Sequence, residues 1–335
     1  MFKKLVFLFL LAIISFSVFA WVNLSKPLPI SEDQEVRIPY NSTLNGAVNI
    51  LKEKGMLGSP FLFKWTARAY SELNGVKVHA GAYKFSHKQT HFELIKSLFS
   101  GKQAFTARVT FPEGISLKEF ASLVQKRVET DSAEFMRYAT SDSLCRAHGI
   151  PAKNVEGYLM PDTYEFFWKE PAKNIVNKLL AAQNALWEKS FKAEAAEKNL
   201  SRHRVLTLAA IVESETPVAA ESPRVAGVYQ NRLLKGMKLD ADPTVQYALG
   251  GVKRRLLYKD LEVDSPYNTY RFTGLPPGPI NSPGAKAIAA ALNPEKHRYI
   301  YFVAKPDGSG EHIFSENFAQ HNKAVAEYRK AKRGQ

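Results

Sequence analysis

The feature that most constrains this chain is an uncharged apolar run near its N-terminus. Lys3 and Lys4 come first, and no charged residue follows in residues 5–24. This length is near the ~20 residues that a helix needs to cross the hydrocarbon core of a bilayer. Because the lysines precede the run, we expect the N-terminus in the cytoplasm and everything after about residue 25 outside it. The run therefore predicts a membrane helix followed by an extracytoplasmic body.

A cleaved signal peptide is the alternative interpretation of the same run. Val18, Phe19 and Ala20 loosely fit a small-residue cleavage site. The run is longer than the ~7 to 15 apolar residues of a typical signal peptide, which favours an anchor. Both interpretations place the body outside the cytoplasm. Nucleic acid is therefore not expected as a partner, and the formal charge of +14 suits a membrane surface or an acidic polymer better.

The composition indicates a globular body with a sizeable core. The chain has 335 residues, of which 45% are hydrophobic. Its single cysteine, Cys145, excludes an intrachain disulfide and a cysteine-rich metal site. His87 and His91 have the spacing of a metal pair, but helix-start residues separate them and no third ligand is near in the sequence. We predict no metal and no cofactor.

The expected fold class is α+β, in four segments. Residues 1–25 form the membrane anchor and the start of a polar stalk. Residues 36–104 form a small α/β subdomain, with strands at 36–39 and 79–86, helices at 44–54 and 60–70, and a third helix that Thr90 caps and Gly101 ends. Residues 105–154 form a connecting α/β unit, with a strand at 107–111 and a helix at 116–128. Residues 155–335 form a larger mixed α/β domain.

Four stretches of the larger domain are dense in polar, aromatic, glycine and proline residues. Such loops offer many hydrogen-bond partners at fixed backbone positions, together with flat aromatic faces, and these are the groups that bind sugars. The stretches are EGYLMPDTYEF (156–166), IVESETP (211–217), VYQNRLLKGMKLDADPTVQYALG (228–250) and DSPYNTYRFTGLPPGPINSPG (264–284).

Two glutamates in the second stretch have different expected roles. Two positions along a helix rotate a side chain by about 200°, so Glu213 and Glu215 face nearly opposite sides. Pro217 disfavours helical geometry at Thr216 and so ends the helix near Glu215. A partly buried carboxyl at a helix C-terminus resists ionisation, which suits a general acid for glycosidic oxygen. Glu213, deeper in the helix, is expected to pair with an arginine or to cap a neighbouring loop.

The four stretches, followed by YIYFVAKPDGSGEHIFSENFAQHN (299–322), resemble the successive signature blocks of the membrane-anchored endolytic murein transglycosylases. The resemblance covers nearly all of the extracytoplasmic chain and keeps the order of the blocks. It implies an inner-membrane anchor, a LysM-like subdomain at 36–104 and a catalytic domain at 155–335. Members of this family cut peptidoglycan glycan strands internally, leave a 1,6-anhydro end and use no metal. Their catalytic acid is the second glutamate of the E-x-E-T block, which is Glu215 here.

Other polar residues in the matched blocks are candidates for sugar contacts. They are Glu213, Tyr158, Asp162, Tyr164, Asn231, Asp242, Thr244, Gln246, Tyr247, Tyr267, Asn268, Thr269 and Asn281. Arg232 and Arg271 are candidates for binding muramyl or peptide carboxylates, although an ion pair within the protein explains them equally well.

Two other functions stay open on the residues alone. A hydrolase of the muramidase type would need a second carboxylate, for which Asp240, Asp242 and Asp264 are available. A LysM-type scaffold would bind peptidoglycan without cutting it. The resemblance favours the transglycosylase, held in the cell inner (plasma) membrane by a single span, with glycan strands as substrate, membrane lipid around the anchor and peptidoglycan synthases as neighbours.

Overall fold

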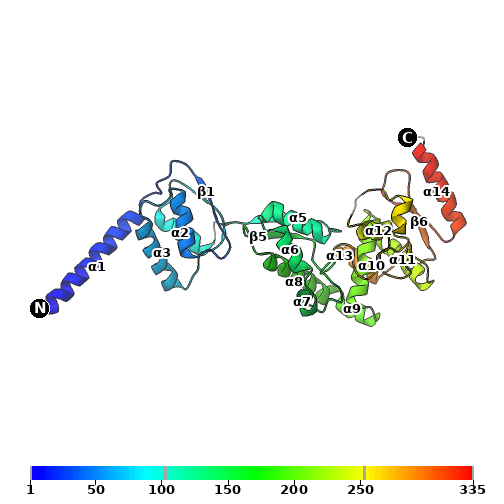
Figure 1. The fold of residues 1–335 in the computed structure, drawn as a ribbon, viewed down its shortest axis with the longest axis horizontal. Helices are drawn as coiled ribbons and strands as arrows, with labels where there is room; N and C mark the ends of the chain where they lie inside the picture. Colours follow the sequence, from blue (N-terminus) through cyan, green and yellow to red (C-terminus); the bar gives the residue numbers. More distant parts are fainter. Residues whose placement is uncertain (1, 102–103, 252–253, 334–335) are drawn as a thin grey trace. The chain divides into compact units, whose positions relative to one another are not determined.

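The computed structural model describes residues 2–101, 104–251 and 254–333 (Figure 1). The chain forms two compact units. Unit 1 comprises residues 1–109, 125–130 and 164–171, and unit 2 comprises residues 110–124, 131–163 and 172–335. The fold is mixed, with many helices and small sheets, in agreement with the predicted fold class.

Unit 1 contains a three-stranded antiparallel sheet and four helices among its described residues. The sheet has the order β1-β2-β3, with Gln34 opposite Phe85 and Ala82 opposite Phe105. The elements are α1 (Phe2–Leu24), β1 (Gln34–Ile38), α2 (Leu44–Glu53), α3 (Pro60–Asn74), β2 (Gly81–Phe85), α4 (His91–Ser100) and β3 (Ala104–Phe105).

Local sequence explains where these helices begin and end. Thr43 and Ser59 cap α2 and α3, and Thr90 forms the predicted capping box with Glu93 at the start of α4. The predicted helix over 60–70 is correct in type and too short by four residues. It continues to Asn74 because its stop is Gly75, which takes the left-handed conformation at φ 63°.

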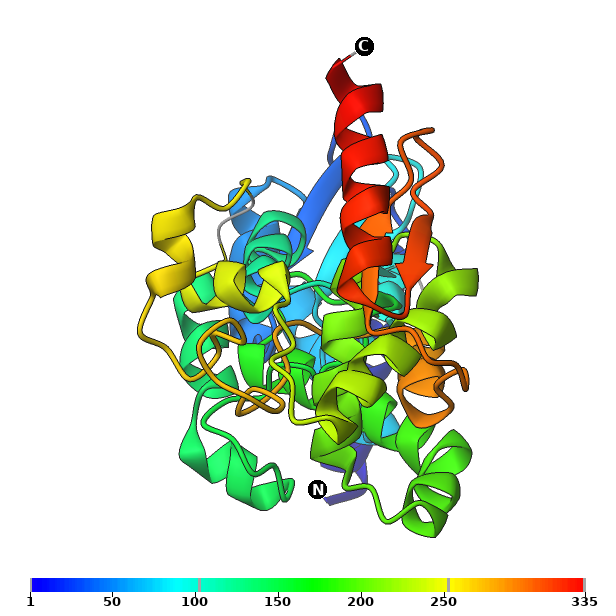
Figure 2. The same ribbon diagram turned by 90° about the vertical axis from the view of Figure 1, so that its right-hand side faces the viewer.

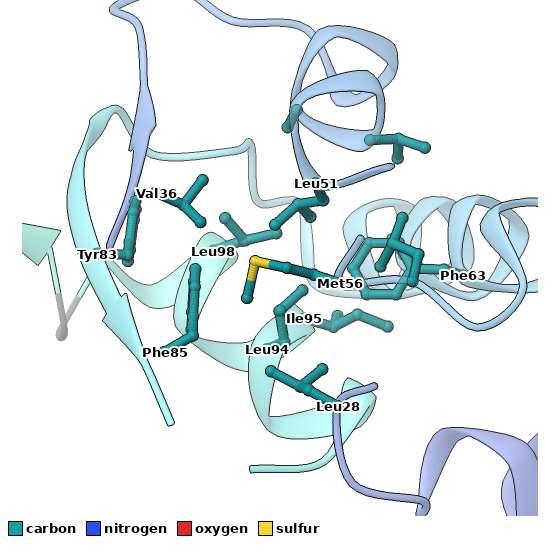
Figure 3. Close-up of a cluster of buried hydrophobic side chains, with 14 of the residues drawn as sticks. Leu28, Val36, Leu51, Met56, Phe63, Tyr83, Phe85, Leu94, Ile95 and Leu98 are labelled. Atoms are coloured by element: carbon teal, nitrogen blue, oxygen red, sulfur yellow. The ribbon is translucent and has the colours of Figure 1, made fainter. Parts of the chain in front are cut away.

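The core of unit 1 is a cluster of apolar side chains from the sheet and from α2, α3 and α4 (Figure 3). Val36, Leu51, Phe85 and Leu98 have no exposed surface, and Met56 lies between the sheet side and Phe63 (Figure 3). Alternation along β1 and β2 sends every second side chain into this cluster. Burial of these side chains therefore holds unit 1 together.

The predicted N-terminal helix is present as α1. Among the helices in the described part of the chain, none is long and apolar enough to cross a membrane. Membrane attachment stays a prediction from the sequence.

Three elements contribute residues to both units. They are β4 (Ala107–Thr110), α5 (Leu117–Val128) and β5 (Thr163–Phe166), and β4 pairs with β5. The strand predicted at 107–111 and the helix predicted at 116–128 are confirmed to within one residue at each end.

The remaining elements belong to unit 2 (Figure 1). They are α6 (Ser132–Ala139), α7 (Asp142–Ala147), α8 (Ala172–Ser190), α9 (Lys192–Glu197), α10 (Arg202–Glu215), η1 (Ala219–Glu221), α11 (Ser222–Leu234), α12 (Asp242–Ala248), η2 (Tyr258–Glu262), α13 (Ala285–Leu292), β6 (Tyr301–Ala304), β7 (His312–Ser315) and α14 (Phe318–Arg333). Helices α8 and α9 are separate, because the chain leaves helical geometry at the buried Phe191.

Helix α10 is the centre of unit 2. Every residue from Val205 to Val212 is buried, so the helix is apolar on all sides, and it contacts both α11 and α13. The antiparallel hairpin β6–β7 contacts α14 (Figures 1 and 2). The segment 308–310 lies in the turn of this hairpin. A buried central helix gives the residues at its C-terminal end a rigid support.

Candidate functional site

The two glutamates of the sequence analysis lie at the C-terminal end of α10. The helix ends at Glu215, and Thr216 takes extended geometry with φ −136° and ψ 128°, as expected before Pro217. Glu213 and Glu215 contact different helices, α13 and α11, which confirms that they face different sides.

Glu215 accepts a hydrogen bond from a buried tyrosine of α11. The Tyr229 hydroxyl donates to Oε1 of Glu215 at 2.7 Å, and Tyr229 is only 2% exposed. Loss of hydration in this setting raises the pKa of Glu215 to about 7, although the bond from Tyr229 acts in the opposite direction. A fraction of the Glu215 surface stays accessible to solvent. Glu215 is therefore a carboxyl group that is largely protonated below neutral pH and about half protonated near pH 7.

Charged neighbours of Glu215 also affect its ionisation. Asp242 raises the pKa of Glu215 further, and the Arg232 guanidinium lowers it. Asp242 is exposed at the start of α12 and accepts a hydrogen bond from the Tyr270 hydroxyl at 2.7 Å. Burial and the bond to Asp242 raise the pKa of Tyr270. The site thus brings together two carboxyl groups, two tyrosines and one arginine.

Glu213 has a structural partner on the other side of α10. Its Oε2 accepts the backbone N–H of Gly284 at 2.9 Å, and Gly284 precedes the first turn of α13. A carboxylate at this position favours a helix N-terminus. Burial raises the pKa of Glu213, with a smaller contribution from Glu113. The prediction that Glu213 caps a neighbouring segment is confirmed.

A cavity of about 600 Å³ lies beside the end of α10, within unit 2. Its polar lining includes Ser214 and Asn281, and the Asn281 amide donates to Ser214 Oγ at 2.7 Å. Glu215 is not among its lining residues, although Ser214 precedes it in the chain. Further polar lining comes from Asn154, Glu156, Gln246 and Tyr247, and apolar lining from Leu117, Met136, Pro243 and Ile280.

Glu156 is the second carboxyl group with a strongly altered pKa. It is 5% exposed, and its Oε1 accepts the Leu117 N–H at the start of α5 at 3.0 Å. Burial raises the pKa of Glu156 to about 8, and the neighbouring Glu119 adds to this rise. Next to it, Gly157 takes φ 79°, and a Cβ there would lie 2.3 Å from Pro279. Only glycine allows the first and fourth polar stretches to approach this closely.

Several predicted contact residues hold the loops of unit 2 in place. Thr244 and Thr269 are buried and hydrogen-bonded to each other at 2.8 Å. Asn268 donates to two backbone carbonyls at 2.9 Å. Asn231 donates to the His297 and Tyr299 carbonyls, also at 2.9 Å. The structure gives these four side chains partners within the protein.

The two arginines and most of the remaining predicted contact residues also have partners within the protein. Arg232 is 8% exposed, donates to backbone carbonyls and pairs with Asp240, whereas Arg271 forms an exposed pair with Asp264. The other four are located as follows: Tyr158 hydrogen-bonded to His203, Asp162 in an exposed turn, Tyr164 stacked on Phe166, and Tyr267 packed against Tyr247. Of the predicted contacts, Gln246, Tyr247 and Asn281 line the cavity, and Asp242 lies near Glu215.

Sequence reasoning missed Tyr229 and Glu156. Tyr229 lies 14 residues after Glu215 and meets it only because α10 packs on α11, so no local pattern reveals it. Glu156 is the first residue of the stretch EGYLMPDTYEF, and an acidic residue between Val155 and an apolar GYLM segment was an available clue. In the described residues, no three His, Cys, Asp or Glu side chains are grouped so that they could hold a metal ion.

Comparison with known proteins gives consistent matches over most of the chain. The model of the YceG-like family matches residues 36–327. An endolytic murein transglycosylase of Bacillus subtilis is 32% identical over 318 residues, which covers 90% of this chain and 87% of that protein. An endolytic murein transglycosylase of Streptococcus pneumoniae is 28% identical over 361 residues, covering 97% of this chain and 64% of that protein.

A solved structure is similar as well. The crystal structure of a yceG-like protein from Listeria monocytogenes matches with a TM-score of 0.61 and 33% sequence identity. The match covers 87% of this chain and 99% of that chain.

Proposed function

Since the chain belongs to the YceG-like family, we propose that it is an endolytic peptidoglycan lytic transglycosylase, a carbon-oxygen lyase acting on polysaccharide. Its substrate is the bond between N-acetylmuramic acid and N-acetylglucosamine inside nascent glycan strands, and its product carries a 1,6-anhydro end. The observation that carries the proposal is Glu215, a carboxyl group with a pKa of about 7 that directly follows Ser214, a residue of the cavity lining.

In this proposal one carboxyl group acts twice. Tyr229 donates to Oε1 of Glu215, which leaves Oε2 to hold the acidic proton. Glu215 gives this proton to the bridging oxygen as the bond to C1 breaks, and the N-acetyl group of the substrate stabilises the positive centre. The carboxylate then takes the proton of the muramyl C6 hydroxyl, which attacks C1 and closes the anhydro ring. No water enters the product.

One observation favours hydrolysis as a second candidate function. Asp242 lies close enough to raise the pKa of Glu215, and its carboxylate is exposed. A two-carboxylate hydrolase needs an acid and a nearby base or nucleophile, and Glu215 and Asp242 are the candidates for these two roles. The two reactions differ in their products, since hydrolysis leaves a reducing end.

We also propose roles for the segments outside the site. Residues 36–104 serve as a LysM-like glycan-binding subdomain, supported by the order strand, helix, helix, strand, helix. Residues 105–154 connect it to the catalytic segment at 155–335. The uncharged run at 5–24 anchors the chain in the plasma membrane with the catalytic segment outside, beside the peptidoglycan synthases, where it limits strand length. Membrane fractionation and carbonate extraction test the anchor.

Analysis of product ends tests the activity. The full chain in detergent is incubated with purified glycan strands, and the fragments are identified by mass spectrometry. We expect anhydro ends, and we expect Glu215→Gln to slow their formation by about 10²- to 10⁴-fold, the usual contribution of a general acid. Glu213→Gln is the matched control on the same helix and should keep most of the activity. Reducing ends would identify a hydrolase, and uncut strands would identify a scaffold.

A further inference from the structure

Glu156 has one oxygen that the fold does not use. Its Oε1 accepts the Leu117 N–H, whereas Oε2 has no hydrogen-bond partner among the described residues. The side chain is 5% exposed and lines the cavity of about 600 Å³. Capping the start of α5 therefore accounts for Oε1 of Glu156 but gives no role to Oε2. Because Oε2 lacks a partner in the described part of the protein and is still accessible to solvent, water or a ligand in the cavity can supply its hydrogen bond.

The protonation state determines what the free oxygen can do. Burial raises the pKa of Glu156 to about 8, so the group is mainly a neutral acid at pH 7. Since Oε1 already accepts a bond, the proton belongs on Oε2, where it can be donated into the cavity. Glu119 and Lys118 also line the cavity, and Lys118 donates to the Gly250 carbonyl at 3.1 Å.

The rest of the lining suits a neutral ligand. Asn154, Gln246 and Asn281 provide amide groups, and Met136 and Ile280 provide apolar surface. Of the lining residues that the structure describes, Lys118 is the only one with a positive charge, and Glu119 lies next to it in the chain, so a peptide with several carboxylates would find a single counter-ion here. An acetamido sugar combines hydroxyls, an amide and a methyl group, and so matches both kinds of surface.

We propose that this cavity is the subsite for one N-acetylhexosamine residue of the glycan, held by a hydrogen bond from Oε2 of Glu156 to an oxygen of that sugar. The inference rests on the proposed function, because it places a glycan in unit 2. The cavity volume lies within the ~300 to 1,000 Å³ typical of small-ligand sites. Glu156 is a binding residue in this account and takes no part in proton transfer at the cut bond.

The test measures binding without turnover. The full chain carrying Glu215→Gln is titrated calorimetrically with a tetramer of N-acetylglucosamine and, separately, with cellotetraose, which has hydroxyls in place of the acetamido groups. We expect the acetamido tetramer to bind about tenfold more tightly than cellotetraose. Cellotetraose has no acetamido groups, so the amide side chains of the cavity lining would lose their hydrogen-bond partners on the sugar.

Variants of the lining locate the ligand. Glu156→Gln keeps a neutral donor and should retain the affinity, whereas Glu156→Leu should weaken binding about tenfold or more. Met136→Trp fills the cavity from α6 and leaves Glu156 with its cap, so it should also weaken binding. Arg137→Trp, at the exposed neighbouring position, is its matched control and should bind like the parent.

Several results would overturn the subsite. These are equal affinities for both tetramers, parental affinity in Met136→Trp and Glu156→Leu, or no binding of the acetamido tetramer. None of them depends on the lyase reaction, because every protein in the series lacks the Glu215 carboxyl group. If the wild-type protein cleaves glycan but the tetramer does not bind in the cavity, the subsite is refuted and the proposed function stands. If the wild-type protein does not cleave glycan but the affinities are as expected, the proposed function is refuted and the subsite stands.

Discussion

The core of unit 1 and the site of unit 2 are both buried, with opposite consequences. In unit 1 the buried side chains are apolar, as for Phe85 and Leu98, and their burial stabilises the fold. In unit 2 two carboxyl groups, Glu156 and Glu215, are enclosed by protein and are pushed toward their neutral forms. Burial thus stabilises the fold of unit 1, whereas in unit 2 it raises the pKa of carboxyl groups and keeps an acid protonated.

The two units should therefore respond to pH in opposite directions. Burial lowers the pKa of His91 in unit 1, so the unfolded chain binds more protons and stability rises with pH up to about 6.5. Burial raises the pKa of Glu156 from 4.5 to about 8, so the folded state binds more protons and unit 2 loses stability between these pH values. The loss is on the order of 5 kcal/mol.

Hydrogen exchange of the full chain, followed by mass spectrometry from pH 5 to pH 8, measures both units at once. After correction for the intrinsic exchange rate, protection should fall with pH in unit 2 and rise or stay constant in unit 1. Glu156→Gln should remove most of the fall. If protection changed with pH in the same direction in both units, the predicted difference between them would be refuted.

Removing a core side chain of unit 1 should have a slightly smaller effect, without altering the pH response of unit 2. Leu98 has no exposed surface, and Leu98→Ala should lower the unfolding free energy by about 3 kcal/mol. Denaturant unfolding measures this loss. Leu73→Ala is the control, because Leu73 is 86% exposed and its truncation should cost less than about 0.5 kcal/mol. Equal losses in both variants would refute the assigned core.

The smallest effect concerns the two glutamates of α10. Glu213→Gln keeps an oxygen acceptor for the Gly284 N–H and loses the negative charge at the start of α13. We expect a loss of about 1 kcal/mol in unfolding free energy, with activity reduced less than tenfold. Thermal unfolding and the product assay check both parts. A loss of activity as large as that of Glu215→Gln would assign catalysis to Glu213.

The sequence predicted the local structure of unit 1 well because its determinants are local. The capping box of Thr90 and Glu93 and the alternation along β1 and β2 can be read within a few residues. The end of α10 at Glu215 was likewise predictable from Pro217. The error at the end of α3 arose because an available stop, Gly75, lay five residues beyond the predicted end.

Tertiary contacts of the site were much less predictable. Thr244, Thr269 and Asn268 have the residue types of a sugar site, yet their polar groups bond to one another or to the backbone. Whether a polar side chain faces a cavity depends on how helices pack, and that information is spread over distant segments. For the same reason the pairing of Tyr229 with Glu215 could not be read from either residue.

The most direct test of the account is the pH dependence of kcat/KM for glycan cleavage, in the wild type and in Tyr229→Phe. The wild type should lose activity as pH rises through about 7, because the acidic form of Glu215 disappears. Loss of the Tyr229 hydroxyl removes a bond that stabilises the charged form, so this decline should move to higher pH. A decline near pH 4.5, or one that Tyr229→Phe leaves in place, would contradict the account.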